Sequence, residues 1–306
     1  MSGASALGLL LSKDRPLQLD AALNSFLRLA SEAEELRLVV LYGASSTRFA
    51  SQYDQLARYY LGRVGFVAEA QFREQVLEFV SAASDAAREP GPRGAIRTPD
   101  AQETGNTNAS EKPSEFVLFL VDDAMFTRPF RWREVCEALS DNTDALGYSL
   151  RLGRNTTQSY ALSRRQALPV FQQLPAGVLK YNWTRADGDF GYPLEISSSV
   201  YRMEMVAKLV QSLNFKNPNT LESQMALQAG RFAEQFPALL CQEYSLAFSA
   251  PINRVQQTYR NRSGGAAKYS LHALADRFDR GQRIKVDALE GFVPTSCHEE
   301  VEILFE

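Results

Sequence analysis

The chain has few of the residues that build disulfide-rich or zinc-ribbon proteins. It contains three cysteines, Cys136, Cys241 and Cys297, and none of them belongs to a CxxC pair. An odd number of dispersed cysteines indicates neither a disulfide framework nor a zinc ribbon. A reducing compartment is the simplest setting for such cysteines, so we expect a cytoplasmic protein.

Long apolar runs are also missing. The N-terminal run at residues 7–11 is far too short to cross a bilayer, and Lys13 and Asp14 follow it closely. The run also lacks the basic segment and the cleavage site of a signal peptide. We therefore expect no transmembrane segment, while peripheral contact with a membrane is left open.

An excess of charge of either sign is absent as well. The chain has 33 Lys and Arg and 36 Asp and Glu, a formal net charge of −3. This balance gives no global attraction to nucleic acid, so we expect no nucleic-acid partner. The 45% hydrophobic content is typical of a folded globular protein, and 306 residues suit one large α/β domain.

What the sequence does have is an alternation of strand and helix patterns. Continuous apolar runs, typical of strands buried on both faces, occur at residues 6–11, 36–42, 64–68 and 116–121. Apolar side chains at helical spacing follow each of the first three runs. Such alternation implies right-handed crossovers and a parallel arrangement. We predict an α/β fold with a mostly parallel, Rossmann-like central sheet flanked by helices, and ligands beyond the carboxyl ends of its strands.

Beyond residue 123 the alternation is weaker. Residues 148–152 and 200–205 are typical of strands or mixed structure, and residues 221–236 are typical of a helix. No internal repeat is visible. These later segments indicate a smaller C-terminal part attached to the predicted sheet.

Residues 88–115 differ in composition from the rest of the chain. They include four prolines and many small polar residues, with Ile96 as the one large aliphatic side chain. We predict a mobile insertion within one domain, with a linker between two domains as the alternative. The predicted single domain, 1–306, then consists of a first half, 1–125, and a second half with a C-terminal tail, 126–306.

Two adjacent carboxylates, Asp122 and Asp123, end the apolar run at residues 116–121. Burying two carboxylates together is costly unless a cation or hydrogen-bond donors compensate them. Their hard oxygen ligands suit Mg²⁺ or Mn²⁺ bridging a diphosphate. The alternative is that Asp123 caps the following turn while Asp122 faces water.

The order of several motifs carries a resemblance to a known family. Predicted strands are followed by Ser-Lys-Asp-Arg-Pro at 12–16, by Tyr-Gly-Ala-Ser at 42–45, and by Asp122-Asp123. Further matching stretches are residues 148–153, 189–193, 217–222 and 251–256. This pattern covers most of the chain and resembles the family-2-like glycosyltransferases of the GT-A fold, in a poorly characterised bacterial branch. The resemblance implies a GT-A fold and transfer of a sugar from a nucleotide-sugar donor. It also implies that residues 1–125 are the nucleotide-binding half and residues 126–306 the acceptor-side half.

The resemblance also implies roles for individual residues. The residues expected to contact the donor nucleotide are Ser12, Lys13, Asp14, Arg15, Tyr42, Asp122 and Arg254. Asp122 and Asp123 would form the DxD motif, which holds the metal and the donor diphosphate. Ala124 stands where family members often have a third acid, so one ligand of the usual pair is missing. In many GT-A enzymes a late histidine folds back to ligate the same metal, which His298 can do here, although an exposed histidine in an acidic tail is the alternative.

An inverting transfer requires a carboxylate that accepts the proton of the acceptor hydroxyl. Glu222 is the first candidate, because residues 217–219 predict a loop and Leu221 the start of a helix, with Glu222 in its first turn. A first-turn acid that only complements the helix dipole is the alternative. Asp189 is the second candidate and Glu195 the third.

Arg254 also begins a local basic cluster, whose other members are Arg260, Arg262 and Lys268. Such a cluster can clamp a diphosphate or a phosphorylated acceptor, and a solvated surface is the alternative. Together these patterns predict a metal-assisted, inverting glycosyltransferase that uses Mn²⁺ or Mg²⁺ and acts on a saccharide, lipid-linked or protein acceptor. A nucleotidyltransferase and a non-catalytic GT-A-like binding protein are the alternatives. The first of them usually has a Gly-rich loop after its first strand, which residues 11–16 lack.

Overall fold

A computed structural model describes residues 5–85, 114–253 and 267–306. Its centre is a nine-stranded sheet in the order β11-β12-β14-β8-β13-β5-β1-β3-β4. The strands are β1 (Ala6–Lys13), β3 (Leu36–Gly43), β4 (Val64–Ala68), β5 (Phe116–Val121), β8 (Ala145–Ser149), β11 (Gln172–Gln173), β12 (Val178–Asn182), β13 (Ser198–Arg202) and β14 (Ala238–Gln242). Their pairings show that β12 and β13 run against the other seven strands. The predicted α/β class with a mostly parallel sheet is confirmed.

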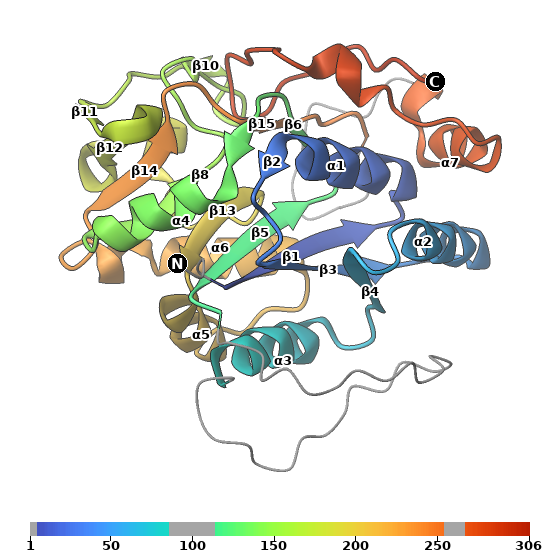
Figure 1. Cartoon of the computed structure of the whole chain (residues 1–306), viewed down its shortest axis with the longest axis horizontal. Helices are drawn as coiled ribbons and strands as arrows, with labels where there is room; N and C mark the ends of the chain where they lie inside the picture. Colours follow the sequence, from blue (N-terminus) through green and yellow to red (C-terminus); the bar gives the residue numbers. More distant parts are fainter. Residues whose placement is uncertain (1–4, 86–113, 254–266) are drawn as a thin grey trace.

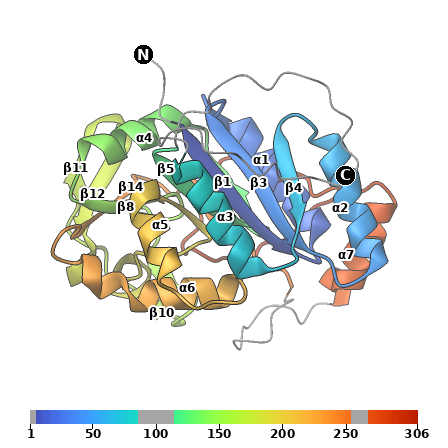
Figure 2. The ribbon, with the colours of Figure 1, turned by 90° about the horizontal axis from the view of Figure 1, so that it is seen from below.

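Helices cover both faces of this sheet (Figure 1). They are α1 (Pro16–Leu29), α2 (Thr47–Tyr59), α3 (Phe72–Asp85), α4 (Trp132–Asp141), α5 (Met203–Gln211), α6 (Pro218–Leu227) and α7 (Leu271–Asp279). Figure 2 shows α3 and α5 side by side on one face, with α1 on the other. The side chains of β1 serve both cores, since Leu10 packs with the α1 side and Leu9 with the α3 side. This two-sided burial explains why the strand is a continuous apolar run.

The first part of the chain follows the sequence pattern closely. The four predicted strands and the three helices between and after them are all present. Pro16 occupies the first turn of α1, where its missing N–H and fixed φ are favourable. Strand β1 continues to Lys13, two residues further than predicted. The buried side chains of these strands therefore predicted the sheet correctly.

The later part of the chain differs from the prediction in three places. Strand β8 covers Ala145–Ser149, earlier than the predicted 148–152. The predicted segment 200–205 is divided, because β13 ends at Arg202 and α5 begins at Met203. Helix α6 begins at Pro218 and ends at Leu227, whereas a helix over residues 221–236 was predicted. The reason for the early start is a capping box, in which Asn217 and Thr220 each bond the other's backbone N–H.

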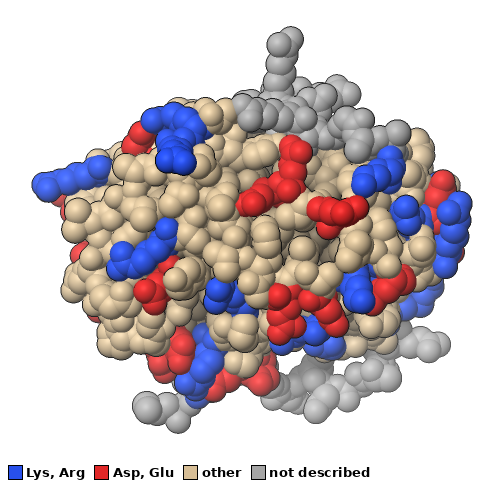
Figure 3. Space-filling view, turned by 90° about the horizontal axis from the view of Figure 1, so that it is seen from above, with Lys and Arg blue, Asp and Glu red and all other residues tan. Residues whose placement is uncertain are grey.

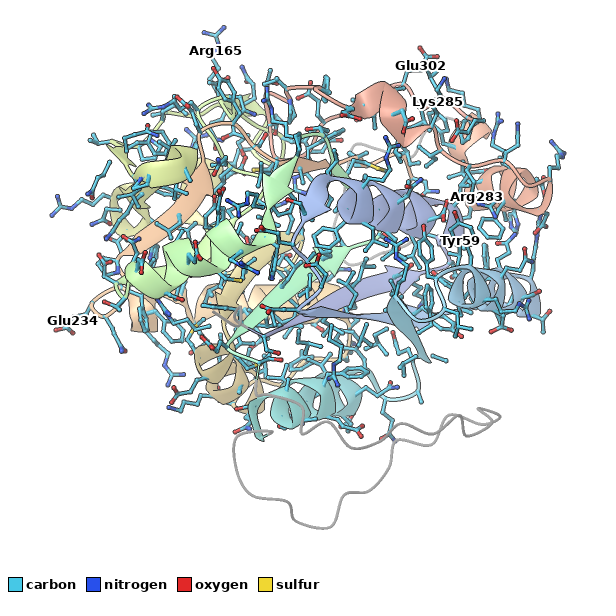
Figure 4. All side chains as sticks on the ribbon, in the orientation of Figure 1. Tyr59, Arg165, Glu234, Arg283, Lys285 and Glu302 are labelled. Atoms are coloured by element: carbon cyan, nitrogen blue, oxygen red, sulfur yellow. The ribbon has the colours of Figure 1, made fainter. Side chains whose placement is uncertain are left out.

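The two predicted halves contribute neighbouring parts of one sheet. Strands β5, β1, β3 and β4 come from the first half and the other five from the second, and β5 and β13 form the junction. Helix α7 near the C-terminus packs against α1 and α2. Arg283 of this C-terminal segment lies beside α1, with its Nε 3.5 Å from Asp20 Oδ2 (Figure 4). The assignment of donor and acceptor roles to the halves stays a prediction.

Further predictions concern the insertion, membrane-spanning helices, the surface charge and the cysteines. Most of the predicted insertion at 88–115 lies outside the described residues, which resume at Ser114. None of the helices in the described ranges is long and apolar enough to cross a bilayer. Acidic and basic side chains are interspersed on the face shown in Figure 3, as the small net charge indicates. The three cysteines are free and buried.

Candidate functional site

Three loops that the sequence singled out lie together at one edge of the sheet. In the strand register, Leu11 faces Val121 and Ser12 faces Tyr42. The carboxyl ends of β1, β3 and β5 are therefore neighbours, and the residues that follow each strand meet there. This is the edge at which parallel sheets bind ligands.

Asp122 is held by donors from the end of β1. Ser12 Oγ donates to Asp122 Oδ2 at 2.9 Å, and the backbone N–H of Lys13 donates to the same oxygen at 3.2 Å. Arg15 Nη1 donates to Asp122 Oδ1 at 3.0 Å. Asp122 is 4% exposed, so the alternative in which it faces water is wrong. The buried carboxylate is compensated by these donors and joins the loops after β1 and β5.

Asp123 is less completely compensated than its neighbour. Arg15 Nη1 lies 3.6 Å from Asp123 Oδ2, beyond ordinary hydrogen-bond distance, and the Asp123 side chain is 18% exposed. Burial raises the pKa of Asp123 to about 6, against the opposing effect of the positive charges of Arg15 and Arg151. Asp123 is therefore the carboxylate of this pair that is available to a cation or a ligand.

Arg15 is anchored on several sides. Its Nη2 donates to the backbone carbonyl of Asn253, and its backbone N–H donates to Tyr53 Oη at 3.1 Å. Tyr53 Oη also lies 2.6 Å from Ser12 Oγ. The guanidinium is thus a fixed part of the site. Arg254, which we predicted to bind the donor, lies outside the described residues.

The remaining residues predicted to contact the nucleoside form the rim of the site. Tyr42 is half-buried, and its ring stacks on Tyr53 with 4.3 Å between centroids. Asp14 has a positive φ of 54° and accepts a hydrogen bond from the backbone N–H of Ser45 at 2.7 Å. An aspartate tolerates this left-handed conformation better than most residues do. Lys13 is exposed. Asp14 thus joins two loops, while Tyr42 and Lys13 remain accessible.

The C-terminal segment carrying His298 returns to the Asp123 side of the sheet. Strands β6 (Ala124–Phe126) and β15 (Ala247–Ser249) pair with Ser249 opposite Ala124. Ser249 also forms a parallel bridge with His298. Ser249 therefore lies between the two segments: its backbone pairs with Ala124, the residue after Asp123, on one side and with His298 on the other. The side chain of Glu299, next to His298, accepts the backbone N–H of Thr295 at 2.5 Å.

The imidazole of His298 is uncharged in this position. Burial lowers its pKa to about 3, and the positive charge of Arg151 acts in the same direction. His298 Nε2 lies 3.5 Å from Arg151 Nη1. The exposed-tail alternative is wrong, because His298 is half-buried and its backbone is bridged. A neutral imidazole is the form that a metal ion binds.

The donor set suits a divalent cation in part. Asp123 offers a partly exposed carboxylate, and His298 offers a neutral imidazole on a neighbouring extended segment, both of which Mn²⁺ accepts. Asp122 fits less well because three donors already engage it. Within the ranges that the structure describes, no group of three His, Cys, Asp or Glu side chains is placed to hold a metal ion. The assignment of Asp122, Asp123 and His298 as ligands stays a prediction.

Glu222 projects from α6 toward the loop that precedes β13. Tyr192 Oη donates to Glu222 Oε1 at 3.3 Å, and the backbone N–H of Ile196 donates to Oε2 at 3.4 Å. The prediction that Glu222 lies in the first turn of the helix is wrong, since Pro218 starts the helix and no acid lies in its first turn. Burial raises the pKa of Glu222, while the charge of Arg151 opposes the rise. A half-buried carboxylate of this kind is a suitable proton acceptor.

The other two candidate bases are more firmly engaged. Asp189 accepts hydrogen bonds from Ser159 Oγ at 3.1 Å and from Gln166 Nε2 at 3.3 Å. Burial raises the pKa of Asp189 as well. Glu195 is buried, 3.1 Å from Arg151 Nη2, and accepts further bonds from the loop that follows it. Glu195 is therefore the least suited of the three to accept a proton from a substrate.

Arg151 is the residue that sequence reasoning missed. It is 6% exposed and lies just past β8, at the same carboxyl edge as Asp123. Its charge acts on Asp123, Asp189 and Glu222, and its guanidinium contacts both Glu195 and His298. Its position directly after a strand could have identified Arg151 in the sequence. The strand predicted at 148–152 instead placed Arg151 inside the strand.

A small polar cavity of about 10 Å³ lies beside Arg151. Asp189, Tyr192, Glu195 and Ser149 contribute to its lining. The Ser149 hydroxyl is buried and has no hydrogen-bond partner among the described residues. A space of this size holds about one water molecule. The cavity therefore adds a polar position beside Arg151 and Asp189.

Fold and site together define an α/β protein with carboxylates and arginines gathered at the carboxyl ends of parallel strands. No protein-family model matches the chain. The chain is 24% identical over 276 residues to the "Bifunctional glycosyltransferase pgtA" of Dictyostelium discoideum, which covers 82% of this chain and 32% of that protein. The chain thus spans about a third of the length of this curated relative. The similarity to a glycosyltransferase over most of the chain confirms the predicted resemblance.

Solved structures were also matched, at low sequence identity. S. aureus TarS 1–349 in complex with UDP matches with a TM-score of 0.47 and 12% identity, over 81% of this chain and 61% of that chain. The mannosyltransferase PcManGT from Pyrobaculum calidifontis, in complex with GDP-Man and Mn²⁺, matches with a TM-score of 0.42 and 12% identity. That match covers 78% of this chain and 55% of the other.

Proposed function

We propose that the chain is a nucleotide-sugar-dependent glycosyltransferase that transfers a sugar, with inversion, to an acceptor hydroxyl. The main support is the meeting of Arg15, Asp122 and Asp123 at the carboxyl ends of β1 and β5. The similarity to a glycosyltransferase over 276 residues supports the same activity. The GT-A classification and the division into donor and acceptor halves are parts of this proposal.

The donor would bind across the ends of the parallel strands. The accessible side chains of Tyr42 and Lys13 would frame the nucleoside, with Ser12 and Asp14 shaping their loops. Arg15 would face the diphosphate, because a guanidinium donates to phosphate oxygens with good geometry. Arg254, which lies outside the described residues, stays a predicted donor-binding residue.

A divalent cation belongs to the proposed donor site. Asp123 and His298 would hold it, and Asp122 would support them through the loop contacts described above. A bound Mn²⁺ or Mg²⁺ would neutralise charge on the departing diphosphate. The neutral state of His298 and the incomplete compensation of Asp123 support these two residues as its ligands.

Glu222 would act as the base. Its carboxylate would accept the proton of the acceptor hydroxyl, whose oxygen forms the new bond to the sugar as the bond to the diphosphate breaks. Burial raises the pKa of Glu222, which makes its carboxylate a stronger base than an exposed one. Asp189 is the second choice, because its two side-chain donors lower its readiness to take a proton. A cytoplasmic setting and a saccharide, lipid-linked or protein acceptor complete the proposal.

Ligand-dependent melting tests this function. We expect UDP or GDP to raise the melting temperature more in Mn²⁺ than in EDTA, because selective binding to the folded state raises stability as RT ln(1 + [L]/Kd). Asp123→Ala should remove the extra shift in Mn²⁺. Equal shifts in Mn²⁺ and EDTA would mean that this pair is not a metal–diphosphate site.

A further inference from the structure

The acidic pair at the end of β5 already has a cation of its own. Arg15 Nη1 lies 3.0 Å from Asp122 Oδ1 and 3.6 Å from Asp123 Oδ2. The same nitrogen therefore faces both carboxylates. The Arg15 side chain is 11% exposed, so bulk water screens this interaction little.

Arg15 is also fixed where it lies. Its Nη2 donates to the carbonyl of Asn253, and the Asn253 side chain is held by Gln18 and by the carbonyl of Tyr269, each at 3.0 Å. The Arg15 Nε is buried and has no partner among the described residues. The guanidinium cannot swing out without losing the contacts to Asn253 and Asp122.

This arrangement limits the negative charge offered to a metal ion. Arg15, Asp122 and Asp123 together carry a net charge of −1 when both acids are ionised. Arg151 brings a second positive charge to the same side, with its Nη1 3.5 Å from His298 Nε2. The affinity of a hard divalent cation depends strongly on the negative charge of its ligands. A diphosphate would supply the charge that the protein side chains lack.

We infer that Arg15 acts as the resident counter-cation of the Asp122–Asp123 pair, so that a divalent cation binds tightly only together with a nucleoside diphosphate. The inference rests on the proposed function, because it takes the metal position at Asp123 from it. Coupling between the two ligands is reciprocal, so Mn²⁺ tightens nucleotide binding by the same factor. Arg15 thus serves as a positioning residue that couples metal binding to nucleotide binding.

Mn²⁺ binding measured by electron paramagnetic resonance tests the inference without any turnover. Wild-type protein alone should bind Mn²⁺ weakly, and UDP or GDP should tighten it by about tenfold or more, within the usual range of coupling. Arg15→Gln should bind Mn²⁺ without nucleotide about tenfold more tightly than wild type. Arg15→Lys keeps the positive charge and should resemble wild type. Arg131→Gln is the matched control, since Arg131 pairs with Glu32 at the surface.

The outcomes separate this inference from the proposed function. Equal Mn²⁺ affinity of wild type and Arg15→Gln without nucleotide would overturn the role of Arg15, even if UDP or GDP binds. Failure of both nucleotides to bind would count against the glycosyltransferase, while the comparison of Mn²⁺ alone would still decide the role of Arg15. Should Arg15→Gln not fold, tight Mn²⁺ binding by wild type without nucleotide overturns the inference, and weak binding that nucleotide tightens supports it.

Discussion

His298 forms a parallel bridge with Ser249, and Ser249 in turn faces Ala124, the residue after Asp123. The C-terminal segment is therefore part of the same small ladder as the end of the DxD-like motif. This pairing brings together two residues that are distant in sequence. It explains why the imidazole is half-buried and why its pKa is lowered to about 3.

The lowered pKa predicts an acid-sensitive step in stability. The unfolded chain gains a proton on His298 as pH falls below 6.5, whereas the folded protein does not until about pH 3. Folding stability should therefore fall as pH drops from 6.5. In EDTA, the free energy of unfolding of the wild type should fall between pH 7 and pH 5. His298→Gln should make this fall smaller by about 1–2 kcal/mol, measured by urea unfolding. His272→Gln, on the exposed face of α7, is the control, and identical pH dependence of both variants would contradict the burial of His298.

Removal of the proposed base should separate binding from chemistry. Glu222→Gln keeps the shape of the side chain: its amide oxygen can accept the N–H of Ile196 and its amide nitrogen can donate to Tyr192 Oη, but it cannot accept the proton. Turnover should fall by about 10²–10⁴-fold while the dissociation constant of the donor stays nearly unchanged. Steady-state kinetics and donor titration measure the two quantities. Glu204→Gln, an exposed acid paired with Lys208, should be neutral. If Glu222→Gln is equally active, Asp189 becomes the base to test.

The pH profile should report the environment of Glu222. Burial raises its pKa above the ordinary 4.5, so the carboxylate is lost to protonation earlier as pH falls. The acidic limb of kcat/KM should therefore lie above pH 4.5, with activity rising as pH increases through it. Initial rates from pH 4 to pH 8 check this. An acidic limb at or below 4.5 would argue against a buried base.

The two adjacent aspartates should differ in their effect on stability. Asp122→Ala removes the buried partner of Arg15 and should cost about 3–5 kcal/mol in the free energy of unfolding. Asp123→Asn should instead raise it at pH 7, by up to about 3 kcal/mol, because burial disfavours the ionised form of Asp123 and raises its pKa from 3.8 to about 6. Urea unfolding at pH 7 compares the two. Equal losses would show that both acids serve the fold alike.

The first four strands of the sheet could be predicted from sequence, most clearly β1 and β5, which are buried on both faces, whereas β11, β12 and β14 were not predicted. The apolar runs ending at Leu11 and Val121 are short enough to favour strands over helices, and the ends of parallel strands lie at one edge of a sheet. The position of Asp122 and Asp123 at that edge was predictable for the same reason. That Arg15 would neutralise them was not, because its contact to Asn253 joins segments far apart in the chain.

Tertiary contacts also determined the features that the sequence did not predict. The capping box of Asn217 and Thr220 moved the start of α6, and with it the position of Glu222 on the helix. Arg151 stood inside a predicted strand that in fact ends at Ser149. Only the resemblance predicted that the segment carrying His298 folds back to the acidic pair. A single β-bridge, such as that between His298 and Ser249, leaves no periodic pattern in the sequence.

The central claim is that this site cleaves a nucleotide-sugar bond, and slow donor hydrolysis measures it most directly. A panel of UDP- and GDP-sugars would be incubated with the protein in Mn²⁺, and the released nucleoside diphosphate quantified against Asp123→Ala and Glu204→Gln. We predict that at least one donor is hydrolysed by wild type and Glu204→Gln and that Asp123→Ala loses this activity. Hydrolysis of no donor, or equal hydrolysis by Asp123→Ala, would contradict the account.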